Sequence, residues 1–263
     1  MNEVDSHVTQ ADPHPGTAPL GVQLYSVRDD IGPGDLTRTL GRLAAMGITH
    51  VEPYTILANR AEFKAALRET GLTATAAHAN VVTDERDAYL AAARDLGLKT
   101  LIVPWTDPED LSERDDIAAF AGMVNDAARR AADLGISVGY HNHDFEFSQH
   151  VDGVAAYEIL VDTLDEGVVL EVDTHWASVG GADVFELLPR LGDRIRFLHV
   201  TNEPADDDDP PVQGVDITGR MDEVIAAGRA LGAMPVLEVV VHEGDIFPVL
   251  ERNAAYFGKL VRA

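Results

Sequence analysis

Short apolar segments alternate along this chain with longer stretches in which Ala, Leu and Arg recur at helical spacing. The length and composition of the apolar segments are typical of buried strands. These strands are expected at 20–25, 50–52, 73–78, 100–104, 137–141, 168–173, 195–200 and 234–240. Helices are expected near 35–46, 60–70, 84–97, 112–134, 153–163, 182–191, 217–231 and 246–262.

The order of these elements indicates a single-domain α/β fold, the (β/α)8 TIM barrel. Eight strand–helix units fit the length of the chain, as this barrel requires. Several helices end at a glycine followed by an apolar residue, as at Gly71 and Gly97, which is the usual junction between a helix and the next strand. A doubly wound open sheet competes, but the turn after the first strand has no glycine-rich phosphate loop. We expect a barrel over 19–263 and a disordered leader over 1–18.

The composition excludes several kinds of site. The chain has no cysteine, which excludes disulfides, thiolate zinc sites, iron–sulfur clusters and cysteine nucleophiles. Its 45 acidic residues against 20 Lys and Arg give a formal charge of −25, which opposes binding to nucleic acid or anionic membranes. A charge of this size is compatible with salt adaptation and equally with solubility alone. No apolar run reaches the roughly 20 residues of a membrane span, and no signal peptide is recognisable. We therefore expect a soluble, cytoplasmic protein.

The densest group of chemically active residues follows the strand at 137–141. His141, His143 and Glu146 fall within six positions of one another. The strand spacing of two places the two histidines on the same face. Burying such residues is costly unless a metal or a proton-transfer site uses them.

Three later strands also end in residues that can bind a metal. Asp173 closes the sixth strand, His199 ends an apolar run in the seventh, and Glu238 lies in the eighth. Since the active site of a barrel lies at the carboxyl ends of its strands, these side chains are expected to converge. Carboxylate and imidazole ligands without sulfur suit Mn²⁺, Mg²⁺, Co²⁺ or Zn²⁺. A bound divalent metal explains this pattern better than a metal-free hydrogen-bond network.

Four segments resemble the xylose-isomerase-like sugar phosphate isomerase/epimerase family. They are residues 21–26, the His-Asn-His-Asp-Phe-Glu-Phe block within 140–147, residues 173–176 with Gly180-Gly181, and residues 198–200. The block is the most specific part of a resemblance that runs from about residue 20 to the C-terminus. The resemblance implies a TIM barrel and one divalent metal, commonly manganese, held by residues at the ends of strands five to eight.

Carried over by position, the resemblance makes Asp173, His199 and Glu238 metal ligands from strands six, seven and eight. Relatives place a glutamate where this chain has His141, and Glu146 follows a few residues later. Glu146 is favoured as the fourth ligand because a third carboxylate better neutralises a divalent cation, and His141 is the alternative.

The chain departs from the family pattern next to these ligands. Thr201 and Asn202 replace a lysine and an acid that often follow the histidine of strand seven. Val240 replaces the aspartate that often follows the glutamate of strand eight. These changes keep the metal ligands and alter the groups that face the substrate.

A site of this kind suits proton abstraction next to a carbonyl, with a metal-stabilised enediolate. Glu238 or His143 is the candidate base, and Glu146 or His141 is the candidate for returning the proton. The predicted function is therefore a sugar, keto-sugar or inositol-derivative isomerase or epimerase. Where the substrate carries a β-leaving group the same carbanion eliminates, so a keto-sugar or inosose lyase or dehydratase is the close alternative.

Further strand-end residues are candidates for substrate contact, and each also has a reading as a hydrogen-bonded or packed structural residue. They are Tyr25, Glu52, His78, Trp105, His175 and Trp176. His175 is expected on the strand face two positions beyond Asp173. The two tryptophans have the flat apolar surface that stacks on a sugar ring.

The expected partner is a small carbohydrate. No cluster of Arg or Lys marks a phosphate pocket, so a sugar without phosphate is favoured. Barrels of this kind often dimerise through exposed helices, and a homodimer is compatible with the sequence. A non-catalytic sugar-binding barrel is the alternative from another functional class. DNA repair enzymes share the barrel, but they need a three-metal cluster with more histidines, and the charge of this chain opposes DNA.

Overall fold

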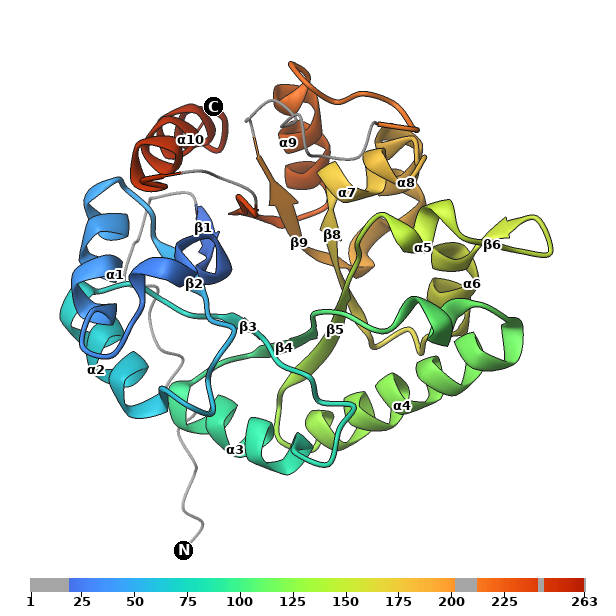
Figure 1. The fold of residues 1–263 in the computed structure, drawn as a ribbon, viewed down its shortest axis with the longest axis horizontal. Helices are drawn as coiled ribbons and strands as arrows, with labels where there is room; N and C mark the ends of the chain where they lie inside the picture. The colour runs from blue at the N-terminus through green and yellow to red at the C-terminus, as the bar shows by residue number, and fades with distance from the viewer. Residues whose placement is uncertain (1–18, 202–211, 241–243, 263) are drawn as a thin grey trace, which may run out of the picture.

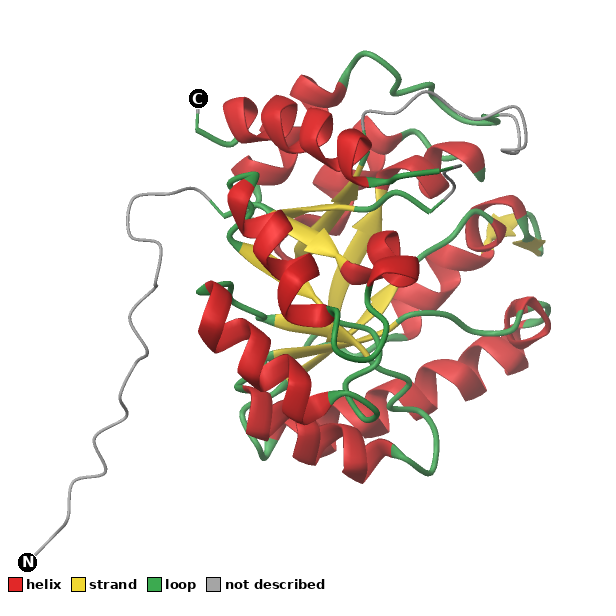
Figure 2. Ribbon diagram, turned by 60° about the vertical axis from the view of Figure 1, so that its left-hand side comes forward, coloured by secondary structure: helices red, strands yellow, loops and turns green. Residues whose placement is uncertain are grey.

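All eight predicted strands are present, and they run parallel around a barrel (Figures 1 and 2). The computed structural model describes residues 19–201, 212–240 and 244–262, so the predicted leader and Asn202 lie outside the described residues. The strands are β1 (Gly21–Gln23), β2 (His50–Glu52), β3 (Ala76–His78), β4 (Thr100–Val103), β5 (Ser137–His141), β8 (Val169–Asp173), β9 (Ile195–Val200) and β10 (Met234–Leu237). The predicted fold class, a (β/α)8 barrel, is confirmed.

A helix follows each strand, and these helices form the outer layer (Figure 1). They are α1 (Leu36–Ala45), α2 (Arg60–Thr70), α3 (Arg86–Leu96), α4 (Arg114–Ala132), α6 (Ala156–Thr163), α8 (Val184–Leu191), α9 (Met221–Ala230) and α10 (Phe247–Leu260). Two of them, α2 and α3, end at Gly71 and Gly97 in the left-handed conformation, as the glycine pattern predicts. No helix among the described residues is long and apolar enough to cross a membrane.

Several short elements in the connections between the strands and the outer helices were not predicted. They are the 3₁₀ segments η1 (Leu24–Asp30), η2 (Pro108–Leu111) and η3 (Gly192–Arg194), the helices α5 (Phe145–Ser148) and α7 (Thr174–Val179), and the hairpin β6 (His150–Val151) with β7 (Val154–Ala155). The first strand therefore stops at Gln23, because its side-chain oxygen accepts a hydrogen bond from the backbone N–H of Tyr25 and starts η1.

The barrel closes least regularly between β2 and β3. The ladder runs in the order β2-β1-β10-β9-β8-β5-β4-β3, and the two end strands share no continuous ladder. They are joined by an isolated bridge between His50 and Thr73 and by a hydrogen bond from the backbone N–H of His78 to the carbonyl of Pro53. We call this junction the β2–β3 seam.

Inside the barrel, a polar layer lies directly beyond an apolar one. The apolar layer consists of Ala76, Ile102, Phe197 and Val236, with Val169 and Met234 packed against it. Alternate residues of a strand face the same side, and on four of these strands the inward residue two positions later is polar. These residues are His78, Glu171, His199 and Glu238, and all four are buried.

The turn between β5 and α5 packs tightly against Gly180, at the end of α7. A Cβ atom at Gly180 would collide with the carbonyl oxygen of Asp144 and would lie 2.8 Å from Cβ of Phe147. We expect Gly180→Ala to destabilise the fold by about 1–3 kcal/mol, because the backbone of the turn must shift. Thermal unfolding measures this as a lower Tm.

The control for this substitution is Gly122→Ala on the exposed side of α4. A Cβ atom at Gly122 would meet nothing within 4 Å. Alanine there should add about 0.5–1 kcal/mol of stability, since it has the better helix propensity. Equal Tm values for the two variants would contradict the close contact at Gly180.

Candidate functional site

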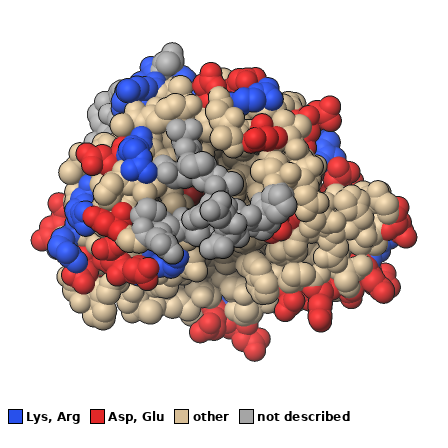
Figure 3. Space-filling view, turned by 45° about the horizontal axis from the view of Figure 1, so that its top comes forward, with Lys and Arg blue, Asp and Glu red and all other residues tan. Residues whose placement is uncertain are grey.

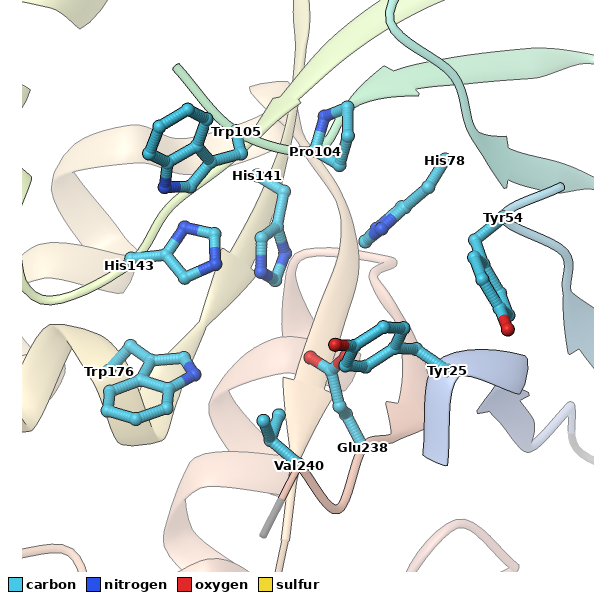
Figure 4. Close-up of a pocket in the computed structure, with 10 residues that line it drawn as sticks. All are labelled: Tyr25, Tyr54, His78, Pro104, Trp105, His141, His143, Trp176, Glu238 and Val240. Carbon is cyan, nitrogen blue, oxygen red and sulfur yellow. The ribbon is translucent and has the colours of Figure 1, made fainter. Parts of the chain in front are cut away.

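A cavity of about 400 Å³ opens at the carboxyl ends of the strands (Figure 4). Aromatic side chains surround its mouth, and histidines and a glutamate lie deeper. Its lining consists of Tyr25, Tyr54, His78, Pro104, Trp105, His141, His143, Trp176, Glu238 and Val240. Seven of these residues belong to the set that the sequence singles out, so the structure brings most of the predicted site together.

Four buried residues from consecutive strands offer ligand atoms that lie within 4.8 Å of one another. We call this set the four-donor group: His141 of β5, Asp173 of β8, His199 of β9 and Glu238 of β10. They come together because the strands pair in register, with Asp173 opposite His199 in the ladder. A buried group of two carboxylates and two imidazoles without sulfur fits a divalent metal.

His199 connects the four-donor group to a second layer of carboxylates. Its Nδ1 lies 2.8 Å from Oε2 of Glu238, and its Nε2 lies 2.9 Å from Oε2 of Glu52. Since both nitrogens face carboxylate oxygens, both carry a proton in the ion-free chain. Burial alone would lower the pKa of His199, but the charges of Glu171 and Glu238 raise it well above its ordinary value.

The two carboxylates of the four-donor group have opposite pKa shifts. Burial and the charge of Glu238 raise the pKa of Asp173 to about 7. Burial also disfavours the charge on Glu238, but the neighbouring His199 lowers the pKa of Glu238 to about 2. Two carboxylates this close resist being ionised together, and a divalent cation between them would remove that repulsion. The residues present therefore fit a bound metal.

His143 faces the cavity as a neutral imidazole. Burial and the proximity of His141 lower the pKa of His143 to about 3. Its Nδ1 is buried and has no hydrogen-bond partner, and its ring centroid lies 5.0 Å from that of His141. The ring also stacks on Phe145, with the centroids 6.0 Å apart. His143 therefore presents an unprotonated ring to the cavity.

The structure does not place Glu146 with the other predicted ligands. Its Oε1 accepts a hydrogen bond from the hydroxyl of Tyr140 at 2.7 Å, and its Oε2 accepts one from the backbone N–H of His143 at 2.8 Å. Glu146 is fully buried, lies outside the four-donor group and does not line the cavity. The reason is local, because residues 145–148 form α5 and direct this side chain back under the turn. In the structure, Glu146 holds the backbone that carries His143.

Two predicted substrate contacts also lie away from the cavity lining. His175 was expected on a strand face, but the strand ends at Asp173, whose carboxylate accepts a hydrogen bond from the backbone N–H of Trp176 and begins α7. Glu52 is buried beneath the cavity, where it bonds to Gln23 and His199. Neither His175 nor Glu52 lines the cavity.

Sequence reasoning missed Glu171, Tyr54 and Asn142. Glu171 stands two residues before Asp173, and this spacing on one strand could have indicated that both carboxylates face the barrel interior. Tyr54 makes an edge-on contact with Tyr25 at the mouth, which no local pattern indicates. Asn142 bonds through its side chain to both the backbone N–H and the carbonyl of Asp173, and thereby fixes the end of β8.

Comparison with known protein families gives a match to the xylose isomerase-like TIM barrel model over residues 40–229. The chain belongs to this family. A search of curated protein sequences finds no match. The family membership agrees with the predicted resemblance, and the matched region contains three of the residues in the four-donor group.

Solved structures share the fold of this xylose isomerase-like barrel. A sugar phosphate isomerase/epimerase from Parabacteroides distasonis superimposes with a TM-score of 0.76 at 21% identity, covering 93% of this chain and 95% of that one. An L-ribulose 3-epimerase gives 0.68 at 14% identity, with 93% and 95% covered. The 3-keto-D-glucoside 4-epimerase of E. coli gives 0.66 at 18% identity, with 91% and 98% covered. At these identities the likeness establishes the fold.

Proposed function

We propose that this protein is a divalent-metal-dependent sugar isomerase or epimerase, with manganese as the preferred ion. The observation that carries this proposal is the four-donor group, of which His141 and Glu238 line an aromatic-rimmed cavity while Asp173 and His199 are buried beside them. His141, Asp173, His199 and Glu238 would hold the ion. The family and the sugar epimerases that share the fold support a carbohydrate substrate.

In this proposal the fourth ligand is His141 and not Glu146. The side chain of His141 is buried among the other three donors and lines the cavity. Both carboxylate oxygens of Glu146 are already occupied by hydrogen bonds in the turn. Moving Glu146 to the ion would leave the hydroxyl of Tyr140 and an amide of the turn without partners.

The chain's own side chains supply the proton chemistry. A divalent ion, when bound, polarises the substrate carbonyl and lowers the energy of the enediolate. His143 faces the cavity unprotonated and can take the proton next to the carbonyl, with Glu238 as the other candidate base. Return of the proton to the opposite face gives an epimer, and return to the adjacent carbon gives an isomer.

The cavity favours a sugar without a phosphate group. Its described lining includes no lysine or arginine, and residues 202–211 and 241–243 contain none in the sequence. Arg28 lies near the mouth, but its guanidinium bonds to the carbonyls of Tyr25 and Val240 and stacks over the Tyr25 ring. Trp105, 46% exposed, and Trp176 offer flat surfaces for a sugar ring.

The test is exchange of a substrate proton with solvent deuterium. The full chain is freed of metal with EDTA, dialysed and incubated in D₂O with L-ribulose or 3-keto-D-glucoside, with and without Mn²⁺, and followed by NMR. We expect Mn²⁺-dependent loss of the signal of the proton next to the carbonyl, together with formation of an epimer or isomer. An α,β-unsaturated product would instead identify the lyase or dehydratase alternative. Sugar binding without exchange would identify a non-catalytic barrel.

A further inference from the structure

One carboxylate oxygen of Glu171 lies among three imidazoles. Its Oε1 is 2.7 Å from Nε2 of His78, 3.1 Å from Nδ1 of His141 and 3.1 Å from Nε2 of His199. All four side chains are buried, and Glu171 is fully so. Of these three contacts, the one with Nε2 of His78 is a hydrogen bond.

Strand register puts Glu171 behind the four-donor group. Its Cα pairs with that of His141 in the ladder between β8 and β5, and Asp173 follows two residues later on the same face. Glu171 is outside the four-donor group and outside the cavity lining. It therefore lies one layer deeper than the proposed ion, next to two of the proposed ligands.

Glu171, together with Glu52 in the case of His199, faces one nitrogen of each ring and so bears on which nitrogen is left for an ion. A ring nitrogen that points at a carboxylate oxygen favours the imidazole tautomer with the proton on that nitrogen, which leaves the other nitrogen for an ion. His199 thereby directs Nε2 toward Glu171 and Glu52, and its Nδ1 faces Glu238 and Asp173. The buried Nδ1 of His141 has no hydrogen-bond partner, and Oε1 of Glu171 lies 3.1 Å from it, so Glu171 is the acceptor within its reach and Nε2 is left for the ion.

We propose that Glu171 is the positioning residue of the metal centre, orienting His141 and His199 and supplying a third negative charge behind them. This inference rests on the proposed function. The third carboxylate that the sequence places at Glu146 is thus provided by Glu171, through the imidazoles and without contact with the ion. Carboxylates that orient metal-binding histidines typically contribute 10- to 100-fold in metal affinity.

A second cation is the competing explanation for the same residues. His78, His141, Glu171 and His199 also offer ligand atoms within 4.8 Å of one another. Two of these four histidines and carboxylates are shared with the four-donor group, however, and Nε2 of His199 already bonds to Glu52. A positioning role requires one ion per chain, whereas a second site requires two.

The experiment measures Mn²⁺ affinity and stoichiometry of the full chain by calorimetric titration. The wild type should bind one equivalent, and Glu171→Gln should still bind one equivalent with an affinity 10- to 100-fold weaker. Glu146→Gln is the matched comparison, because it replaces another fully buried glutamate that lies outside the four-donor group, and its affinity should stay within about threefold of wild type. If Glu171→Gln fails to fold, a second pair of variants tests the same point. Glu171→Asp keeps the carboxylate and should bind Mn²⁺ at least tenfold more tightly than Glu171→Asn.

Three results would overturn the inference. Equal Mn²⁺ affinities of the wild type and Glu171→Gln would show that the carboxylate of Glu171 does not contribute to metal binding. Equal affinities of Glu171→Asp and Glu171→Asn would show the same. Two equivalents in the wild type and one in Glu171→Gln would make Glu171 a ligand of a second ion. Absence of Mn²⁺ binding by the wild type would defeat the proposed function itself, which distinguishes that failure from failure of the role of Glu171. The Tm of each ion-free variant shows whether a change in affinity reflects loss of fold.

Discussion

Asp173→Asn is expected to weaken Mn²⁺ binding by more than about 100-fold, beyond the effect of losing an orienting carboxylate, and to abolish metal-dependent proton exchange. The substitution removes one of only two carboxylates in the four-donor group and leaves the shape of the side chain nearly unchanged. Asparagine is as good a helix cap as aspartate, so the hydrogen bond to the backbone N–H of Trp176 and the start of α7 should persist. Calorimetric titration and the D₂O assay measure the two losses.

The same substitution should stabilise the ion-free protein at alkaline pH. The pKa of Asp173 is raised from 3.8 to about 7 in the fold, so the folded chain holds a proton that the unfolded chain releases between these values. Folding stability of the wild type therefore falls as the pH rises from about 4 to 7, and asparagine avoids that loss. We expect a higher Tm than wild type at pH 8 without metal, and little difference at pH 4.

Asp183→Asn is the matched control for Asp173→Asn. Asp183 also caps a helix, accepting hydrogen bonds from the backbone N–H groups of Phe185 and Glu186 at the start of α8, but it is outside the four-donor group. The substitution Asp183→Asn should leave the Mn²⁺ affinity unchanged. If Asp173→Asn binds Mn²⁺ as well as this control does, the proposed ligand set is wrong.

The second large expected effect is a rise in the thermal stability of the protein with salt concentration. The formal charge of −25 repels itself in the compact state more than in the unfolded chain, and added salt screens that repulsion. Acidic side chains are prominent on the surface in Figure 3. We expect the Tm to rise by about 5 °C or more between 0.01 and 1 M NaCl, which corresponds to roughly 2 kcal/mol for a domain of this size.

The shape of the salt dependence identifies its cause. The Debye length falls from about 30 Å at 0.01 M to about 3 Å at 1 M, so most of the rise should occur below 1 M and should be the same for NaCl and KCl. Exposed ion pairs such as Arg220–Glu223 are weakened by the same screening, but fully exposed pairs contribute little to stability. A Tm that is flat below 1 M and rises only with sulfate would indicate a general effect on apolar burial and contradict electrostatic screening.

The barrel and three of its key side chains could be predicted because both follow from local periodicity. Asp173, His199 and Glu238 lie at or near the ends of apolar strands, and parallel strands bring their carboxyl ends to one place. That inference needs no knowledge of tertiary packing. For the same reason every strand lies within its expected range, although β1, β3 and β10 are about half as long as expected.

The remaining parts of the site depend on how the chain turns after each strand. Glu146 seemed suited to bind metal by its chemistry, but one turn of helix directs it toward Tyr140. The predicted position of His175 on a strand face is wrong for the same reason, since Asp173 both ends the strand and caps α7. Glu171 was not predicted because it is one carboxylate within an otherwise apolar strand. Its contacts are with histidines of three other strands, which only the tertiary structure brings together.

The β2–β3 seam gives the residues around the proposed metal site a second, structural role. Glu52 on one side of the seam and His78 on the other have few backbone bonds between their strands, yet both side chains reach the same cluster around His199 and Glu171. Hydrogen bonds and ion pairs between side chains thus join β2 and β3 to the rest of the barrel where few backbone hydrogen bonds do so. A ligand that stabilises this cluster therefore also stabilises the closed barrel. Binding at the site and the stability of the fold are thermodynamically linked.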